Sequence, residues 1–196
     1  AEFVLARNDN YWGKKPEWDR VVYRPISNAA ARVAALLAGD VDMIEDPPTD
    51  DLPKLKGDKK LYVEETPSVR VVYVALDQFA EPSPGIQGTE KNPMKDKRVR
   101  EALSLAINRD ALVERVMGGV ALPAGNLLPY PMFGSSKEHA KAPKADVEKA
   151  KALLKEAGYP NGFSITLGSP SGRYVNDSKV AQAIASMWTR IGVKTS

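Results

Sequence analysis

Residues 20–44 read RVVYRPISNAAARVAALLAGDVDMI, and this segment predicts a strand, a helix and a second strand. Ser27 or Asn28 can cap the helix, because a side-chain oxygen at that position accepts a free backbone N–H. Gly39 stands where a left-handed C-terminal cap is expected, and the short segment VDMI at 41–44 follows as the second strand. This order predicts a βαβ crossover.

Two regions of different texture follow the crossover. Residues 61–76 hold first alternating and then nearly continuous apolar side chains, which predicts strands, the later one buried on both faces. Residues 77–93 are interrupted by prolines and glycines, so we expect a linker or a long surface loop there.

The second half of the chain has the periodicity of helices. After Asp96, which can cap a helix, one apolar stripe recurs at helical spacing: Val99, Ala102, Leu103, Ala106 and Ile107. The remaining expected elements are a helix after Asn108 that stops at Gly118, a loop rich in proline, glycine and aromatic residues over 120–143, a helix over 146–157, a strand over 163–167, a helix over 177–191 and a strand entry at 192–194. The predicted fold class is α/β with two sub-domains.

The composition is that of an ordinary globular protein, and its 196 residues suggest one large domain or two small ones. The absence of cysteine excludes zinc ribbons, iron–sulfur clusters, thiol catalysis and disulfides within this sequence. The net charge is 28 − 25 = +3, and the basic residues are scattered among acids, which disfavours a nucleic-acid partner. No apolar run approaches the roughly 18 residues of a membrane helix.

Motifs for catalysis and cofactor binding are missing. The single histidine, His139, lies in a polar stretch and is predicted to be a solvated loop residue. The sequence has neither a P-loop nor a GxGxxG motif, and GSPSG at 168–172 has Pro170 where a nucleophile elbow needs serine. The acidic residues of 40–51 lack the order of an EF-hand. We therefore predict no catalytic residue, no metal site and no cofactor.

Several segments carry a resemblance when they are taken in order: RNDNYWG at 7–13, WDRVVY at 18–23, LLAGDVD at 36–42, KRVREALSLAINR at 97–109, the region from Lys149 to Tyr159, GRY at 172–174 and IGV at 191–193. Together they resemble the family 5 extracellular solute-binding proteins, the peptide-binding components of bacterial ABC importers. Asp9 stands where that family commonly has proline.

The resemblance implies a type 2 periplasmic-binding-protein-like fold, in which two lobes built from discontinuous segments close on a ligand. Members are longer exported proteins, so the chain is expected to be an incomplete, middle segment. Its first residues, AEFVLAR, have no basic head before an apolar core and do not form a signal peptide. Residues 1–78 would belong to the first lobe, 79–95 to a crossing or linker, and 96–196 to the second lobe.

The implied function is capture rather than catalysis. Oligopeptides or dipeptides would bind in the inter-lobe cleft and pass to ABC transporter permease subunits in the membrane. The binding protein itself would lie in the periplasm, or be anchored by lipid outside a Gram-positive cell. The alternatives are a nickel complex, haem or an oligosaccharide on the same fold. A more remote one, an α/β hydrolase, would have to use His139.

Six residues are predicted to face the cleft: Asp77 and Gln78 at the crossing, Asn126 and Tyr130 in the aromatic loop, and Arg173 with Tyr174 after a strand end. Strand ends are where α/β clefts bind ligands, and Arg173 could pair with a carboxylate; its alternative role is that of an exposed loop arginine. In this family the strand that crosses between the lobes more often ends in asparagine, whereas this chain has Asp77 at that position.

Overall fold

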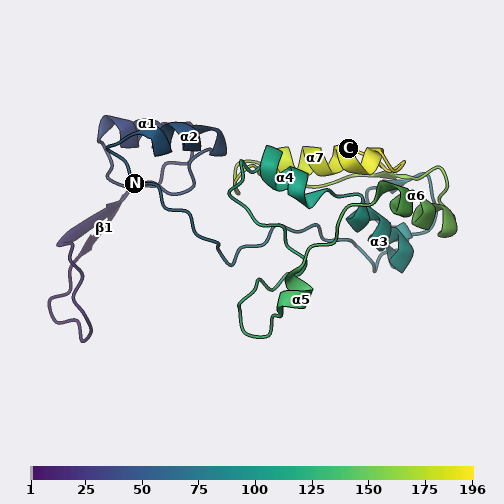
Figure 1. Ribbon diagram of the computed structural model, residues 1–196, viewed down its shortest axis with the longest axis horizontal. Helices are drawn as coiled ribbons and strands as arrows, with labels where there is room; N and C mark the ends of the chain where they lie inside the picture. Colours follow the sequence, from purple (N-terminus) through teal and green to yellow (C-terminus); the bar gives the residue numbers. More distant parts are fainter. Residues whose placement is uncertain (1) are drawn as a thin grey trace. The chain divides into compact units, whose positions relative to one another are not determined.

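The computed structural model describes residues 2–196. The chain divides into two compact units, Ala1–Leu52 and Pro53–Ser196 (Figure 1). The lobe assignment expected from the resemblance concerns a longer protein, and it stays a prediction beside this division.

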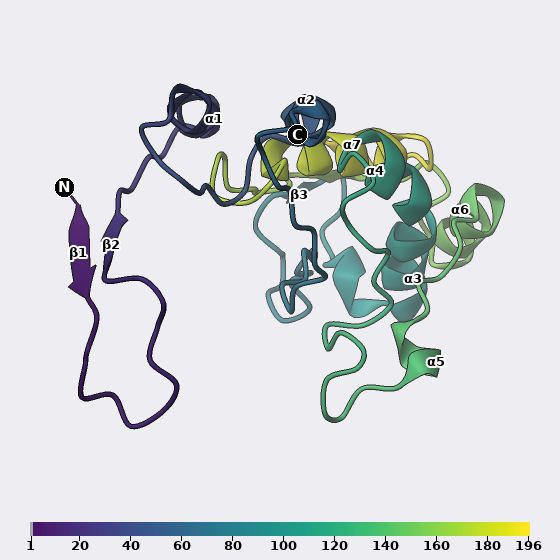
Figure 2. The same ribbon diagram turned by 60° about the vertical axis from the view of Figure 1, so that its left-hand side comes forward.

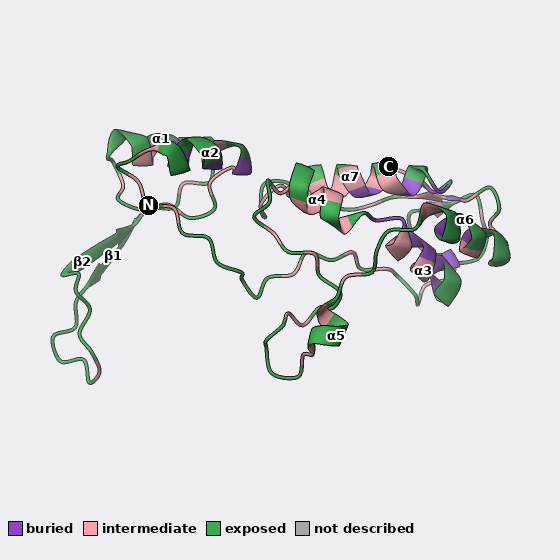
Figure 3. Cartoon of the chain, in the orientation of Figure 1, coloured by how far each residue is buried: buried purple, intermediate pink, exposed green. Residues whose placement is uncertain are grey.

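The first unit begins with a two-stranded ribbon. Strand β1 (Phe3–Ala6) pairs antiparallel with β2 (Arg20–Tyr23), and every residue of both strands is exposed (Figure 3). Helix α1 (Ala29–Ala38) then starts at Asn28, whose side chain accepts the Ala31 N–H, and ends at Gly39 with a φ of 79°. The strand at 20–23, the cap and the glycine end are thus confirmed. A short 3₁₀ helix, η1 (Thr49–Asp51), closes the unit.

The second strand of the predicted βαβ crossover is absent, so that prediction was wrong for residues 41–44. A strand needs a neighbour for its backbone hydrogen bonds, and β2 finds its partner in β1 instead. The carbonyls just after this stretch are taken by a side chain: Arg32 donates Nε to Glu45 O at 3.2 Å and a terminal nitrogen to Asp46 O at 2.8 Å. The guanidinium of Arg32 therefore stabilises the segment that follows residues 41–44.

The second unit is mainly helical and has one small sheet. Its helical elements are α2 (Leu52–Gly57, which crosses the boundary between the units), the 3₁₀ helix η2 (Pro93–Lys95), α3 (Lys97–Leu105), α4 (Arg109–Arg115), α5 (Lys137–Ala140), α6 (Val147–Glu156) and α7 (Asp177–Thr189). The strands β3 (Ile86–Gln87), β4 (Ser164–Ile165) and β5 (Lys194–Thr195) follow the order β3-β4-β5. Strand β3 is antiparallel to β4, and β5 is parallel to it.

The strands predicted over 61–76 are also absent, and this was the larger error. Val69, Val72 and Tyr73 are each about two-thirds exposed, so this run is not buried on both faces. Only Val74 and Leu76, near its end, pack against the core. The apolar pattern is present, but within residues 2–196 no strand pairs with it, and a strand needs a hydrogen-bonded neighbour.

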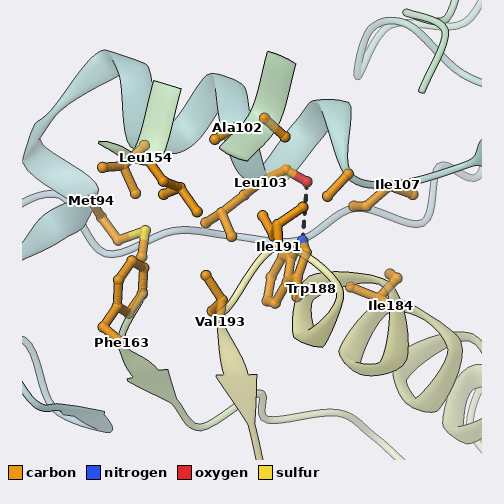
Figure 4. Close-up of a cluster of buried hydrophobic side chains, with 13 residues drawn as sticks. Met94, Ala102, Leu103, Ile107, Leu154, Phe163, Ile184, Trp188, Ile191 and Val193 are labelled. Atoms are coloured by element: carbon orange, nitrogen blue, oxygen red, sulfur yellow. Dashed lines mark hydrogen bonds between the residues drawn. The ribbon is translucent and has the colours of Figure 1, made fainter. Parts of the chain in front are cut away.

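One hydrophobic core holds the second unit together (Figure 4). All five apolar positions predicted on the helix after Asp96 are buried, as are Ala150 and Leu154 of α6 and Ile184 and Trp188 of α7. Phe163 and Val193 close the cluster from the sheet side. Burial of a valine, leucine, isoleucine, phenylalanine or methionine side chain contributes about 1.5–3 kcal/mol relative to exposure. The buried stripe is therefore a major source of stability for the second unit.

The turn after α6 approaches the turn after α7 so closely that glycine is required. A Cβ on Gly162 would lie 1.9 Å from the carbonyl oxygen of Gly192. Gly162 also has a φ of 70°, which side chains of L-residues disfavour. This contact fixes the entry of β4 beside β5, where Lys194 donates its N–H to Phe163 O at 2.9 Å.

The loop between α4 and α6 extends away from this core. Figures 1 and 2 both show α4 lying along α7, whereas α5 and its flanking chain stand apart from the packed helices. His139 lies in α5 and is exposed, as predicted for a solvated residue, although in a short helix rather than a loop.

Candidate ligand-binding residues

Arg173 and Tyr174 form a pair on the turn before α7. Arg173 donates Nε to the Tyr174 hydroxyl at 3.0 Å, and its guanidinium carbon lies 5.4 Å from the centre of the Tyr174 ring. Both residues are exposed. Nε is used inside the pair, and neither terminal nitrogen donates to another described residue. These two nitrogens form a forked donor, the geometry that suits a carboxylate.

The backbone beneath this pair is held by Asp177, the first residue of α7. Its carboxylate accepts the N–H groups of Arg173 at 2.9 Å and Tyr174 at 3.1 Å, and also those of Gly172 and Ser178. These bonds, that from Tyr174 foremost, lower the pKa of Asp177 from 3.8 to about 2. The sequence identified Asp177 only as the start of a helix and missed this role.

Asp77 is committed to its own loop. Its Oδ1 accepts the N–H groups of Phe79 at 2.9 Å and Ala80 at 3.2 Å, and its Oδ2 accepts the Ser83 hydroxyl at 2.9 Å. The bond from Phe79, followed by those from Ala80 and Ser83, lowers the pKa of Asp77. Gln78 beside it is exposed. The carboxylate of Asp77 therefore closes a turn, and Gln78 is the freer of the two side chains.

Asn92 is hydrogen-bonded to the loop that contains Asp77, and the sequence analysis did not identify it. The residue is 4% exposed, and its amide nitrogen donates to Asp77 O and Ala80 O, both at 2.9 Å. Its Oδ1 accepts the Met94 N–H at 2.9 Å. The signal that could have found it is an asparagine directly before a proline, a common start for a turn or helix.

Asn126 and Tyr130 lie on the loop that carries α5. Asn126 Oδ1 accepts the Leu127 N–H at 2.7 Å, and Tyr130 is about half exposed with Lys137 Nζ 5.7 Å from its ring centre. No hydrogen bond or ring contact within residues 2–196 joins this loop to the Asp77 turn or to the Arg173–Tyr174 pair. The six predicted residues thus occupy three separate loops of the second unit.

The surface also carries a shallow groove of about 470 Å³ between α6 and the end of α7, with Lys151, Lys155 and Arg190 in its wall. It contains none of the six predicted residues. Within the described residues, no cluster of three or more His, Cys, Asp or Glu side chains could hold a metal ion. None of the helices over residues 2–196 has both the length and the hydropathy needed to cross a membrane.

Comparison with known protein families identifies the family of this chain. A family model described as bacterial extracellular solute-binding proteins, family 5, middle part, matches residues 1–196. The chain belongs to this family. The resemblance seen in its motifs is therefore confirmed over the whole sequence.

Two curated members of family 5 illustrate the range of relatives. The dipeptide-binding protein of Escherichia coli (strain K12) is 34% identical over 189 residues, which cover 95% of this chain and 33% of that protein. Heme-binding protein A of Haemophilus influenzae is 36% identical over 197 residues, which cover 96% of this chain and 33% of that protein. The chain thus spans about a third of the length of these relatives.

A solved family 5 structure gives the fold. The ABC transporter-associated periplasmic binding protein DppA from Helicobacter pylori, in complex with peptide STSA, matches with a TM-score of 0.76 and 29% identity, over 100% of this chain and 35% of that chain. The structural neighbours are type 2 periplasmic binding proteins, so the predicted fold class is confirmed, for the part of that fold which this chain covers.

Proposed function

We propose that the protein carrying this chain is the solute-binding component of an ABC importer that captures oligopeptides or dipeptides between two lobes. Ligand contacts would stabilise the closed state, and the closed form would dock on permease subunits in the membrane. The proposal places it in the periplasm, or anchored by lipid outside a Gram-positive cell, and gives it no catalytic step. In this scheme residues 1–78 contribute to one lobe, 79–95 to the crossing and 96–196 to the other.

The observation that carries the proposal is the 34% identity to a dipeptide-binding protein over 95% of the chain. The solved neighbour with peptide STSA adds support at the level of the fold. The similarity to a heme-binding protein, at 36% identity, favours haem as the second candidate on the same fold.

Among the six predicted residues, Arg173 with Tyr174 has the chemistry that best fits a peptide. Its exposed guanidinium can form two parallel hydrogen bonds with a carboxylate, and the neighbouring ring restricts its orientation. Gln78, Asn126 and Tyr130 would supply polar and aromatic contacts. Asp77 would act by shaping its turn, because its carboxylate oxygens already accept bonds from its own loop.

Native mass spectrometry of the full-length protein, with release and sequencing of what stays bound, tests the proposal. Co-purified peptides are the expected result. Bound haem, a metal chelate or a sugar would keep the fold and replace the substrate. An empty protein would lead to a thermal-shift screen across these four ligand classes, and a positive result with a class other than peptides would overturn the peptide proposal.

Arg173 can be tested directly by calorimetry with the dipeptide Ala-Ala and its C-terminal amide. Arg173→Ala is expected to weaken binding of the free acid by about 10- to 100-fold, the range for a lost charge-assisted hydrogen bond. Arg173→Lys should recover only part of the affinity, since lysine lacks the planar fork. Equal losses for acid and amide would contradict the assignment. His139→Ala should change neither affinity.

A further inference from the structure

The carboxylate of Asp177 is turned inward, toward the backbone of the turn that precedes α7. Its Oδ1 accepts the N–H groups of Gly172 at 3.1 Å and Ser178 at 2.8 Å, and its Oδ2 accepts those of Arg173 at 2.9 Å and Tyr174 at 3.1 Å. Four amide donors on two oxygens use most of the acceptor capacity of a carboxylate. Asp177 is therefore not itself a contact for a charged solute.

The same bonds fix the backbone of the two residues that form the pair. With both N–H groups held by one oxygen, the backbone at Arg173 and Tyr174 has little freedom. Their side chains form the Nε-to-hydroxyl bond of 3.0 Å, and no bond from the terminal nitrogens of Arg173 to another described residue competes for them. The forked donor is thus oriented by the turn rather than by a neighbouring acid.

A second anchor ties the turn to the rest of the unit. Asn176 has a left-handed backbone with a φ of 54° and donates its side-chain amide to Val116 O at 2.7 Å, just beyond α4. This bond locates the turn, whereas the carboxylate of Asp177 sets its internal shape. The hydrogen bonds to the carboxylate lower the pKa of Asp177 to about 2, so it stays ionised well into the acid range.

We propose that Asp177 is a positioning residue for solute recognition: it holds the Arg173–Tyr174 pair so that the free guanidinium nitrogens meet a carboxylate of the bound solute. This inference rests on the proposed function, because it assigns a ligand group to the same site. A carboxylate-bearing solute gains from such pre-organisation, since the ordering of a long arginine side chain has been completed before binding.

A double-mutant cycle in the full-length protein tests the inference, with Ala-Ala and its C-terminal amide as probes. Asp177→Ala is expected to weaken binding of the free acid roughly tenfold and to leave the amide nearly unchanged. In the Arg173→Ala background the same substitution should cause no further loss, because Asp177 acts through Arg173. A loss that is additive, or equal for acid and amide, would overturn the proposal.

Two further variants separate positioning from folding. Asp177→Asn keeps one acceptor oxygen and replaces the Ala variant if that variant fails to fold. Its loss of affinity for the free acid should be smaller than the roughly tenfold loss expected for Asp177→Ala. Asp146→Ala removes a carboxylate at the start of a different helix, the N-cap of α6, which accepts the Lys149 N–H at 2.9 Å. This control should lower the melting temperature without changing the preference for acid over amide, and a changed preference there would count against a special role for Asp177.

Hydrogen exchange without ligand keeps the test independent of the proposed function. Amides of residues 172–174 should exchange at least about tenfold faster in Asp177→Ala and at the wild-type rate in Arg173→Ala. Unchanged exchange in Asp177→Ala would overturn the inference even if peptides bind. Wild-type protein that binds neither probe would contradict the proposed function, and exchange alone would then decide whether Asp177 holds the turn.

Discussion

At the scale of single residues, Trp188 links helix α7 to helix α3. It is 1% exposed, and its indole N–H donates to the carbonyl of Leu103 at 3.0 Å (Figure 4). The last carbonyls of a helix have no partner within the helix, so they need one elsewhere. Around Leu103 the other carbonyls find theirs: Ser104 O accepts from Ile107 and Arg109, and Leu105 O accepts from Asp146.

Trp188→Phe should therefore lower the free energy of unfolding by about 1–3 kcal/mol, because the Leu103 carbonyl is left buried without a donor. Trp188→Ala adds a cavity and should cost about 3–5 kcal/mol. Chemical denaturation followed by circular dichroism measures both. Trp12→Phe is the matched control, since Trp12 is 91% exposed and its change should stay within about 0.5 kcal/mol. A Trp188→Phe variant as stable as this control would contradict the role of the hydrogen bond.

Asn92 is the second residue whose loss has a defined cost. Its amide satisfies the carbonyls of Asp77 and Ala80, and its own N–H donates to Glu81 Oε1 at 2.6 Å. Asn92→Ala should destabilise by about 1–3 kcal/mol and expose the loop 77–92 to proteases. Limited proteolysis with mass spectrometry locates the cuts. Asn161→Ala, at an exposed position, is the control; equal protection of the loop in both variants would show that Asn92 does not hold it.

At the scale of elements, the start of α7 gives a dependence of stability on pH. The pKa of Asp177 is lowered to about 2 in the folded protein, below its ordinary value of 3.8. A lowered pKa means that its contribution is fully present above the unfolded value and is lost as pH falls through about 2. The stability difference between wild type and Asp177→Asn should shrink as urea unfolding is repeated from about pH 6 down to about pH 2. A difference that stays constant would argue against a stabilising role for the ionised carboxylate of Asp177.

Helices were predictable here because their signals are local. The caps at Asn28, Asp96 and Asp146, and the apolar stripe that begins at Val99, all lie within a few residues of the element that they define. Asp177 was found as a helix start by the same rule. Its hold on Arg173 and Tyr174 was not predictable, because it depends on the conformation of the turn rather than on spacing.

Strands were predicted less well because a strand depends on a partner elsewhere in the chain. Residues 41–44 and 61–76 have the apolar patterns of strands and form none, whereas β3 appears within a segment expected to be a loop. The predicted strand over 163–167 is reduced to β4, which has two residues. Spacing cannot supply the register or the identity of a neighbour, which tertiary packing decides.

At the scale of the whole molecule, the two units differ in how much they bury. The core cluster lies entirely within the second unit, in residues between Met94 and Val193. In the first unit both strands are fully exposed, and Val33 is the buried residue of α1. An isolated two-stranded ribbon is only marginally stable in water, so the first unit gains little from its own sheet.

Hydrogen exchange of the 196-residue chain should therefore be strongly divided. Amides of α3, α6 and α7 are expected to be the most protected, because they open only with the core of the second unit. Those of β1 and β2 should exchange at least about a hundredfold faster, since a hundredfold difference needs only about 2.7 kcal/mol between local and global opening. Trp188→Ala should speed exchange in α3 and leave β1 and β2 unchanged. Equal protection of both units, or a shared response to Trp188→Ala, would show that the chain unfolds as one cooperative body.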